Sequence, residues 1–204
     1  MTDMPLPKLI TFYILLLFAT ACQAKEYDLA ILGDSISSGY GVPADDNWVS
    51  LIKPKLNCSS KIQNLSIQGA TSSDGITQLE NFYKKHRSRY LLVELGGNDA
   101  LRGQSLTQLY RNLNEIITMA QEHDSRVLLI GIDLPPNYGG FFRQRLQTTY
   151  AHVAQIHNIE MVQLDFPNNP DLMQDDALHP NPLGHQNIAQ AVLPMINTAM
   201  CSAE

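Results

Sequence analysis

The fold of this chain follows from one stretch near its start, Tyr27-Asp28-Leu29-Ala30-Ile31-Leu32-Gly33-Asp34-Ser35-Ile36-Ser37-Ser38-Gly39-Tyr40-Gly41. An apolar run of strand length ends abruptly at Gly33, and small polar residues that can open a helix follow it. α/β proteins present a reactive hydroxyl in this way, on a serine just after the carboxyl end of a strand. Serine is also common in ordinary turns. The stretch alone therefore does not decide whether Ser35 is a nucleophile or an ordinary turn residue.

Length and charge restrict the class of protein. The chain has 204 residues, of which 44% are hydrophobic and 17% charged, which suits one domain with a full hydrophobic core. Its net charge is -6, and lysine and arginine gather in nothing larger than an adjacent pair. This argues against nucleic acid or an anionic membrane surface as a partner.

The first residues are typical of a secretory signal peptide. Lys8 precedes an apolar run at 9–19 that is too short to span a bilayer comfortably, and small residues follow at 19–24. We expect a signal peptide at 1–24, cleaved after Ala24, and a mature domain at 25–204 that is periplasmic or secreted, with no stable membrane span. A retained anchor is one alternative. Cleavage after Ala21, which exposes Cys22 for lipidation, is another.

Export bears on the two cysteines that remain, Cys58 and Cys201. Both lie near the ends of predicted elements, and an oxidising compartment allows a disulfide between them. Sequence does not give their separation, so a disulfide and two free thiols both stay open.

After residue 24, strand-like and helix-like segments alternate, as they do in a parallel sheet with helices on both faces. The predicted strands are Asp28 to Leu32, Lys61 to Ser66, Tyr90 to Leu95, Arg126 to Ile132 and Ile159 to Leu164. The predicted helices are Asn47 to Leu56, Ser73 to His86, Leu106 to His123, Phe141 to His157 and Pro182 to Met200. The third and fourth strands are nearly continuous apolar runs, which indicates that both of their faces are covered. We expect a single three-layer α/β/α domain with a five-stranded parallel sheet.

Polar residues follow four of these strands, and ligands bind at the carboxyl edge of a parallel sheet. In chain order they are Asp34 and Ser35, Gly69, the run Gly96-Gly97-Asn98-Asp99, and the run Asp175-Asp176-Ala177-Leu178-His179-Pro180. A nucleophile, a base, a carboxylate and amide donors are thus expected at one edge. Together they suit acyl transfer, in which a serine attacks and hydrogen-bond donors receive the negative oxygen.

Each of these residues also has an ordinary structural interpretation. Asp176 is three residues from His179, so it can orient the imidazole, but such a pair can equally be a surface ion pair. Gly69 can be a turn glycine instead of an accessible N–H. Asn98 can cap a helix instead of donating to an oxyanion.

Taken in order, the segments Gly33-Asp34-Ser35, Gly69, Gly96-Gly97-Asn98-Asp99 and Asp176-Ala177-Leu178-His179-Pro180 resemble the four signatures of the SGNH (GDSL) hydrolase superfamily. The similarity extends over essentially the whole chain after the signal, and within the superfamily it is greatest to exported bacterial multifunctional esterases of the thioesterase and lysophospholipase type. The resemblance implies a flavodoxin-like fold. It also implies a monomeric enzyme without cofactor or metal.

The same resemblance implies a role for each site residue. Ser35 is expected to be the nucleophile, His179 the general base and then acid, and Asp176 the residue that orients it. The N–H groups of Ser35 and Gly69 and the side chain of Asn98 are expected to form the oxyanion hole. Family members respond to the acyl chain with the segment after the asparagine, here 98–103, and we expect residues 138–142 to line the acyl groove, or else to pack in the core.

The implied substrates are carboxylic esters and thioesters, among them acyl-CoA, aryl esters and lysophospholipids. A carbohydrate or other small-ester acetylesterase of the same fold is the alternative within the hydrolases, and a non-catalytic binding module is the alternative outside them. A phosphate-binding loop is disfavoured, since the glycine-rich motifs and lysine it needs are missing after Gly33. The remaining histidines show no metal-binding spacing, although His185 lies near the site loop.

Overall fold

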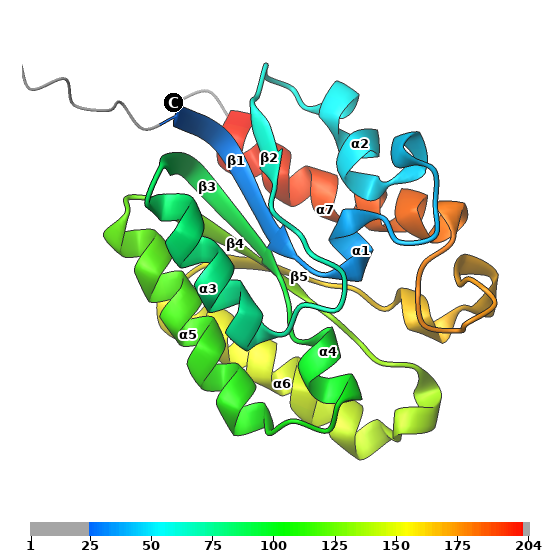
Figure 1. The fold of residues 1–204 in the computed structure, drawn as a ribbon. Coiled ribbons are helices and arrows are strands. Elements are labelled where there is room, and N and C mark those ends of the chain that lie inside the picture. The colour runs from blue at the N-terminus through cyan, green and yellow to red at the C-terminus, as the bar shows by residue number, and fades with distance from the viewer. Residues whose placement is uncertain (1–24, 202–204) are drawn as a thin grey trace, which may run out of the picture.

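A computed structural model of the protein describes residues 25–201, and its centre is one five-stranded sheet in the order β2-β1-β3-β4-β5 (Figure 1). The strands are β1 (Lys25–Gly33), β2 (Ile62–Asn64), β3 (His86–Glu94), β4 (Arg126–Gly131) and β5 (Glu160–Gln163). Every neighbouring pair is parallel. This is the flavodoxin-like strand order, so the predicted fold class is confirmed. The predicted signal peptide, its cleavage sites and Cys22 lie outside the described residues.

Helices cover both faces of the sheet (Figure 1). On one face α3 (Ser72–Tyr83), α5 (Leu106–Glu122) and α6 (Gly140–His157) pack side by side, and on the other α2 (Trp48–Ile52) packs against α7 (Pro182–Cys201). This confirms the three-layer α/β/α arrangement. Between residues 25 and 201, no helix is long and apolar enough to cross a membrane.

Several predicted boundaries were wrong. β3 begins at His86, not Tyr90, because its polar first half pairs with the first residues of β1, where side chains alternate between buried and exposed. The helix before it accordingly ends at Tyr83. The helix predicted for 47–56 is an α-helix only to Ile52 and continues as one 3-10 turn, η2 (Lys53–Lys55). Pro54 explains this change, since proline cannot donate the next α-helical hydrogen bond.

The short helical turns between the main elements were given no bounds from the sequence, although a possible helix start was indicated after Gly33. They are α1 (Ser35–Ser38), α4 (Gly97–Leu101), η1 (Ala44–Asp46), η3 (Pro136–Tyr138), η4 (Phe166–Asn168) and η5 (Pro170–Leu172). A segment of three to five residues has no periodicity to read, so only its capping residues can indicate it. Two of these turns, α1 and α4, carry residues of the candidate site.

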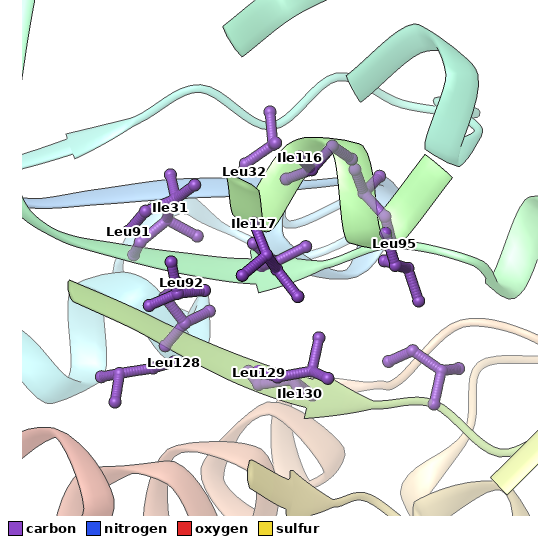
Figure 2. Packing of buried hydrophobic residues seen from close by; sticks show 14 of the residues in the cluster. Ile31, Leu32, Leu91, Leu92, Leu95, Ile116, Ile117, Leu128, Leu129 and Ile130 are labelled. Atoms are coloured by element: carbon purple, nitrogen blue, oxygen red, sulfur yellow. The ribbon is translucent and has the colours of Figure 1, made fainter. Parts of the chain in front are cut away.

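The core lies between the central strands and the helices. Figure 2 shows buried side chains from β1, β3, β4 and α5, and Ile31, Leu91 and Ile117 among them are fully buried. Burying one such side chain contributes roughly 1.5–3 kcal/mol. Because β3 and β4 are buried on both faces, their apolar runs show no alternation. The core holds the carboxyl ends of these strands in fixed positions.

A disulfide joins Cys58, in the loop after η2, to Cys201 at the end of α7. The two Cα atoms are 5.4 Å apart, and the cysteines are 143 positions apart in the sequence. The question that the sequence left open is therefore resolved in favour of a disulfide. The cross-link closes most of the domain into one loop, which reduces the conformational entropy of the unfolded chain.

His185 of α7 is fully buried beneath α2, and its Nδ1 accepts a hydrogen bond from the Trp48 N–H at 3.3 Å. It does not line the cavity described below. Burial lowers the pKa of His185 from an ordinary value of 6.5 to about 4. The folded protein therefore binds fewer protons at this site than the unfolded chain does between these pH values.

We expect this buried histidine to make the protein less stable in mild acid. The neutral, buried imidazole contributes fully to the free energy of unfolding above pH 6.5, and this contribution is lost as the pH falls toward 4. At pH 5 the loss is about 2 kcal/mol. Urea unfolding of wild type and His185→Gln at pH 7 and pH 5 measures it. The wild type should lose about 2 kcal/mol more than the variant between these two pH values. Equal losses in both proteins would contradict the assignment, because other titrating groups cancel in the comparison.

Candidate active site

Ser35 is the first residue of α1, directly after the turn that ends β1. Asp34 makes this turn, and its Oδ1 accepts a hydrogen bond from the Ile36 N–H at 3.0 Å. An aspartate at this position satisfies an N–H at the start of the helix that would otherwise lack a partner. As a result, α1 begins immediately at the strand end, and the Ser35 hydroxyl lies at the edge of a cavity with the residue 8% exposed.

The imidazole of His179 connects Ser35 to Asp176. His179 Nε2 lies 3.0 Å from Ser35 Oγ, and its Nδ1 lies 2.6 Å from Asp176 Oδ2. Both distances are within hydrogen-bonding range. The structure thus brings together three residues that sequence placed at two strand ends. Asp175, which adjoins Asp176, has its side chain exposed.

The Asp176 carboxylate also shapes the turn that presents His179. Its Oδ1 accepts hydrogen bonds from the N–H groups of Leu178 and His179, each at 2.9 Å, and Ala177, directly after Asp176, has a left-handed φ of 54°. Burial by itself would raise the pKa of Asp176, but the hydrogen bonds from His179 and Leu178 outweigh it and leave that pKa below its ordinary value. The carboxylate is therefore ionised at neutral pH and holds the Nδ1 edge of the imidazole.

Asn98 lies in α4, beyond a glycine turn at the end of β3. Gly96 in this turn has φ 119°, and a Cβ there would stand 2.2 Å from the Tyr150 hydroxyl, so only glycine fits. Asn98 Nδ2 donates to Asp34 Oδ2 at 2.8 Å and to the Ala70 carbonyl at 3.1 Å. Since an amide has two hydrogens, donation to a substrate oxygen would have to replace or share one of these bonds.

Ser35, Gly69, Asn98 and His179 all border one cavity of about 340 Å³. Gly69 has φ 73°, and the Arg102 guanidinium donates to its carbonyl at 2.7 Å. The remaining lining is mostly apolar, with Ile36, Tyr40, Leu101, Ile132, Leu134, Pro135, Pro167 and Leu178, and it also includes Asp34, Gln68, Gly97 and Asp133. The predicted site residues are thus gathered around a space that suits an apolar group.

The expected groove residues at 138–142 do not border this cavity. Phe141 is 76% exposed, and Phe142 packs against the core. The wall is formed earlier in the loop, at 132–135, because β4 delivers these residues directly to the edge of the sheet. Asp133 fixes this wall, since it is paired with Arg143 of α6.

Glu94 was missed as a site residue although it lies directly behind the site. It is fully buried at the end of β3, and its Oε2 accepts hydrogen bonds from Ser37 Oγ at 2.7 Å and from the Asp34 N–H at 3.3 Å. Burial, and then the charge of Asp34, raise the pKa of Glu94 well above its ordinary value. Burial also raises the pKa of Asp34, to about 6. A glutamate inside an otherwise apolar strand was the signal in the sequence.

Hydrogen bonds from the Ile36 N–H and the Asn98 side chain favour the ionised form of Asp34, whereas burial and the neighbouring Asp34 carboxylate favour the protonated form of Glu94. The ionised carboxylate then joins the first turn of α1 to the Asn98 side chain. Asp34 thus connects α1 to α4 beside the candidate site. Within residues 25–201, no group of three or more histidine, cysteine or acidic side chains is arranged to hold a metal ion.

Residues 31–186 match the GDSL-like lipase/acylhydrolase family. This chain belongs to that family. Among its relatives, the protein named thioesterase 1/protease 1/lysophospholipase L1 of Escherichia coli strain K12 is 34% identical over 91% of this chain and 92% of its own length. An arylesterase of Vibrio mimicus is 30% identical over 91% of this chain and 95% of its own length. These comparisons confirm the predicted GDSL family and the predicted enzyme class, a hydrolase of the ester type.

Solved structures of GDSL relatives share the fold over almost their whole length. The structure of TesA is 31% identical, with a TM-score of 0.78 over 84% of this chain and 98% of that one. The psychrotrophic esterase EstA from Pseudoalteromonas sp., inhibited by monoethylphosphonate, is 29% identical with a TM-score of 0.78, over 86% and 99%. AlinE4, an esterase of the SGNH-hydrolase family, is 25% identical with a TM-score of 0.68, over 88% of this chain and 98% of that one.

Proposed function

We propose that this GDSL-family protein is a serine hydrolase that cleaves carboxylic esters and thioesters. Ser35 is its nucleophile, His179 its general base and acid, and Asp176 the residue that orients His179. The observation that carries the proposal is the continuous hydrogen-bonded chain from Ser35 Oγ through the imidazole to Asp176, at 3.0 and 2.6 Å, which opens into a cavity with apolar walls.

In the first half of the reaction, Ser35 Oγ attacks the carbonyl carbon of the substrate while His179 Nε2 takes the hydroxyl proton. The carbonyl oxygen becomes negative and accepts hydrogen bonds from the N–H groups of Ser35 and Gly69 and from the Asn98 amide. When the intermediate collapses, the bond to the leaving oxygen or sulfur breaks, and His179 returns its proton to that atom. The alcohol or thiol departs, and the acyl group stays on Ser35.

In the second half, His179 takes a proton from water, and the resulting hydroxide attacks the acyl carbon. The second intermediate collapses with release of the acid, and His179 returns the proton to Ser35. Asp176 remains ionised throughout and stabilises the imidazolium that forms in each half. No cofactor is needed to balance either step.

The cavity favours an acyl chain over a sugar. Seven of its lining residues are aliphatic or proline, whereas an acetylesterase for carbohydrates would need a polar wall with several aromatic rings. Among the described residues that line the cavity, Tyr40 carries the one aromatic ring besides the imidazole of His179. The relatives named thioesterase, arylesterase and lysophospholipase support the same choice. We therefore propose acyl-CoA, aryl esters and lysophospholipids as the substrate class.

We propose further that the enzyme works outside the cytoplasm. The Cys58–Cys201 disulfide supports this location, because such bonds persist in oxidising compartments and are rare in the cytosol of most organisms. The signal-like residues 1–24 point the same way.

A fluorophosphonate tests the proposal directly, since it reacts with a serine only where a base and an oxyanion hole activate the hydroxyl. We expect one equivalent to bind, peptide mass spectrometry to place it on Ser35, and esterase activity to disappear in step with labelling. The Ser35→Ala variant should remain unlabelled. A wild-type protein that hydrolyses esters without labelling at Ser35 would refute the assignment.

A further inference from the structure

Gln174 connects the loop that carries His179 to the segment that follows Ser35. Its side-chain Nε2 donates to the Tyr40 carbonyl at 2.8 Å and to the Pro180 carbonyl at 2.9 Å. Its backbone N–H donates to the His179 carbonyl at 2.8 Å. One half-buried residue therefore contacts both sides of the Ser35–His179 pair from outside the cavity.

Tyr40 is in turn tied to Ser35. The N–H groups of Gly39 and Tyr40 donate to the Ser35 carbonyl at 3.1 and 3.0 Å, which ends α1 in a tight turn. The Tyr40 ring also lies against the imidazole of His179, with ring centroids 4.5 Å apart. Gln174 and Tyr40 thus close a ring of hydrogen bonds whose remaining member is the bond between Ser35 Oγ and His179 Nε2.

The chain next to Tyr40 leaves room for this contact. Gly41 has φ 76°, and a Cβ on it would stand 2.1 Å from Gln174 Oε1, so a larger residue would displace the Gln174 side chain. The Gln174 side chain therefore packs against the backbone of Gly41, which has no side chain of its own. By contrast, the loop residues between Gln174 and Leu178 are exposed, so packing contributes little to holding them.

We propose that Gln174 is a positioning residue that sets the distance between Ser35 and His179. The inference rests on the proposed triad and deepens it. The rest of the domain is held by buried side chains, whereas the loop that carries His179 is held here by hydrogen bonds from the Gln174 side-chain amide. Displacing two reacting groups by about 1 Å can lower a rate by roughly 100-fold, so a modest shift of this loop has a large effect.

The test compares Gln174→Ala and Gln174→Met with wild type on a p-nitrophenyl ester. Methionine keeps the length of the side chain but has no N–H, so it separates lost hydrogen bonds from lost volume. We expect kcat to fall by roughly 10- to 100-fold in both variants, with little change in KM, because Gln174 does not border the cavity. The rate of fluorophosphonate labelling at Ser35 should fall by the same factor.

Asn181→Ala is the matched control. Asn181 Nδ2 donates to the carbonyls of Asp171 at 2.8 Å and Met173 at 3.0 Å, so it makes the same kind of bonds within the same loop but does not reach Tyr40. We expect this variant to lose thermal stability and to keep its kcat.

Unchanged kcat in folded Gln174 variants would overturn the inference, and so would an equal fall in Asn181→Ala, which would point to general loop order. Either result leaves the proposed function intact as long as wild-type activity depends on Ser35. Labelling elsewhere in wild type would instead overturn the proposed function.

Discussion

Ser35→Ala should lower kcat/KM for an aryl ester by roughly 10⁴-fold or more, because the variant has no nucleophile and keeps only binding and oxyanion stabilisation. Folding should be nearly unaffected, since the change removes one hydroxyl whose structural partner is the His179 imidazole. Steady-state assays together with thermal unfolding, in which the melting temperature should move by only a few degrees, measure both effects.

Ser38→Ala serves as the control, because this serine lies in the same short helix and its hydroxyl does not border the cavity. It should retain activity. Comparable turnover in wild type and Ser35→Ala would mean that another residue attacks the ester. The same loss in both serine variants would mean that α1 itself had been disturbed.

Asn98→Ala should lower kcat by roughly 10²- to 10³-fold, the usual effect of removing one oxyanion donor. The structure adds a specific reason for expecting the effect in kcat. Asn98 Nδ2 donates to Asp34 and Ala70, so a substrate oxygen has to compete for one of its hydrogens. The oxygen competes best when it carries the negative charge of the transition state. The measurement is the split between kcat and KM on one aryl ester.

Asn114→Ala is a suitable comparison for this variant. Asn114 is a partly buried asparagine of α5 whose side chain lies 2.7 Å from the His157 ring of α6, away from the cavity. It should lose stability and keep kcat. If Asn98→Ala changes KM alone, Asn98 binds the substrate without stabilising the charged intermediate.

The order and type of the main elements could be predicted because buried strands and amphipathic helices repeat at known periods. Apolar runs such as 91–95 are sufficient to identify a strand covered on both faces. The start of β3 was not predictable in this way. Residues 86–89 are largely polar, and only pairing with β1 makes them a strand. Pairing is a property of the whole fold, which no local window contains.

The convergence of the candidate site residues at one edge of the sheet was predictable for a related reason. Ser35, Asn98 and His179 each follow a strand, and a parallel sheet brings such positions to one edge. Residues that act by supporting others gave weaker signals. In the sequence, Glu94 is a single charged residue at the end of an apolar strand, and Gln174 is one of several polar residues in a loop, so neither position by itself indicated a role. Their roles depend on distances to Asp34 and Tyr40, which become visible only in three dimensions.

The bond between Ser35 and His179 joins residues 144 positions apart in the chain. Ser35 follows β1, the first strand in the chain, and His179 comes after β5, the last strand. A partly folded or shortened chain thus has a serine without a base. In the proposed mechanism, hydrolysis therefore depends on completed folding, because the serine and its base come from opposite ends of the domain.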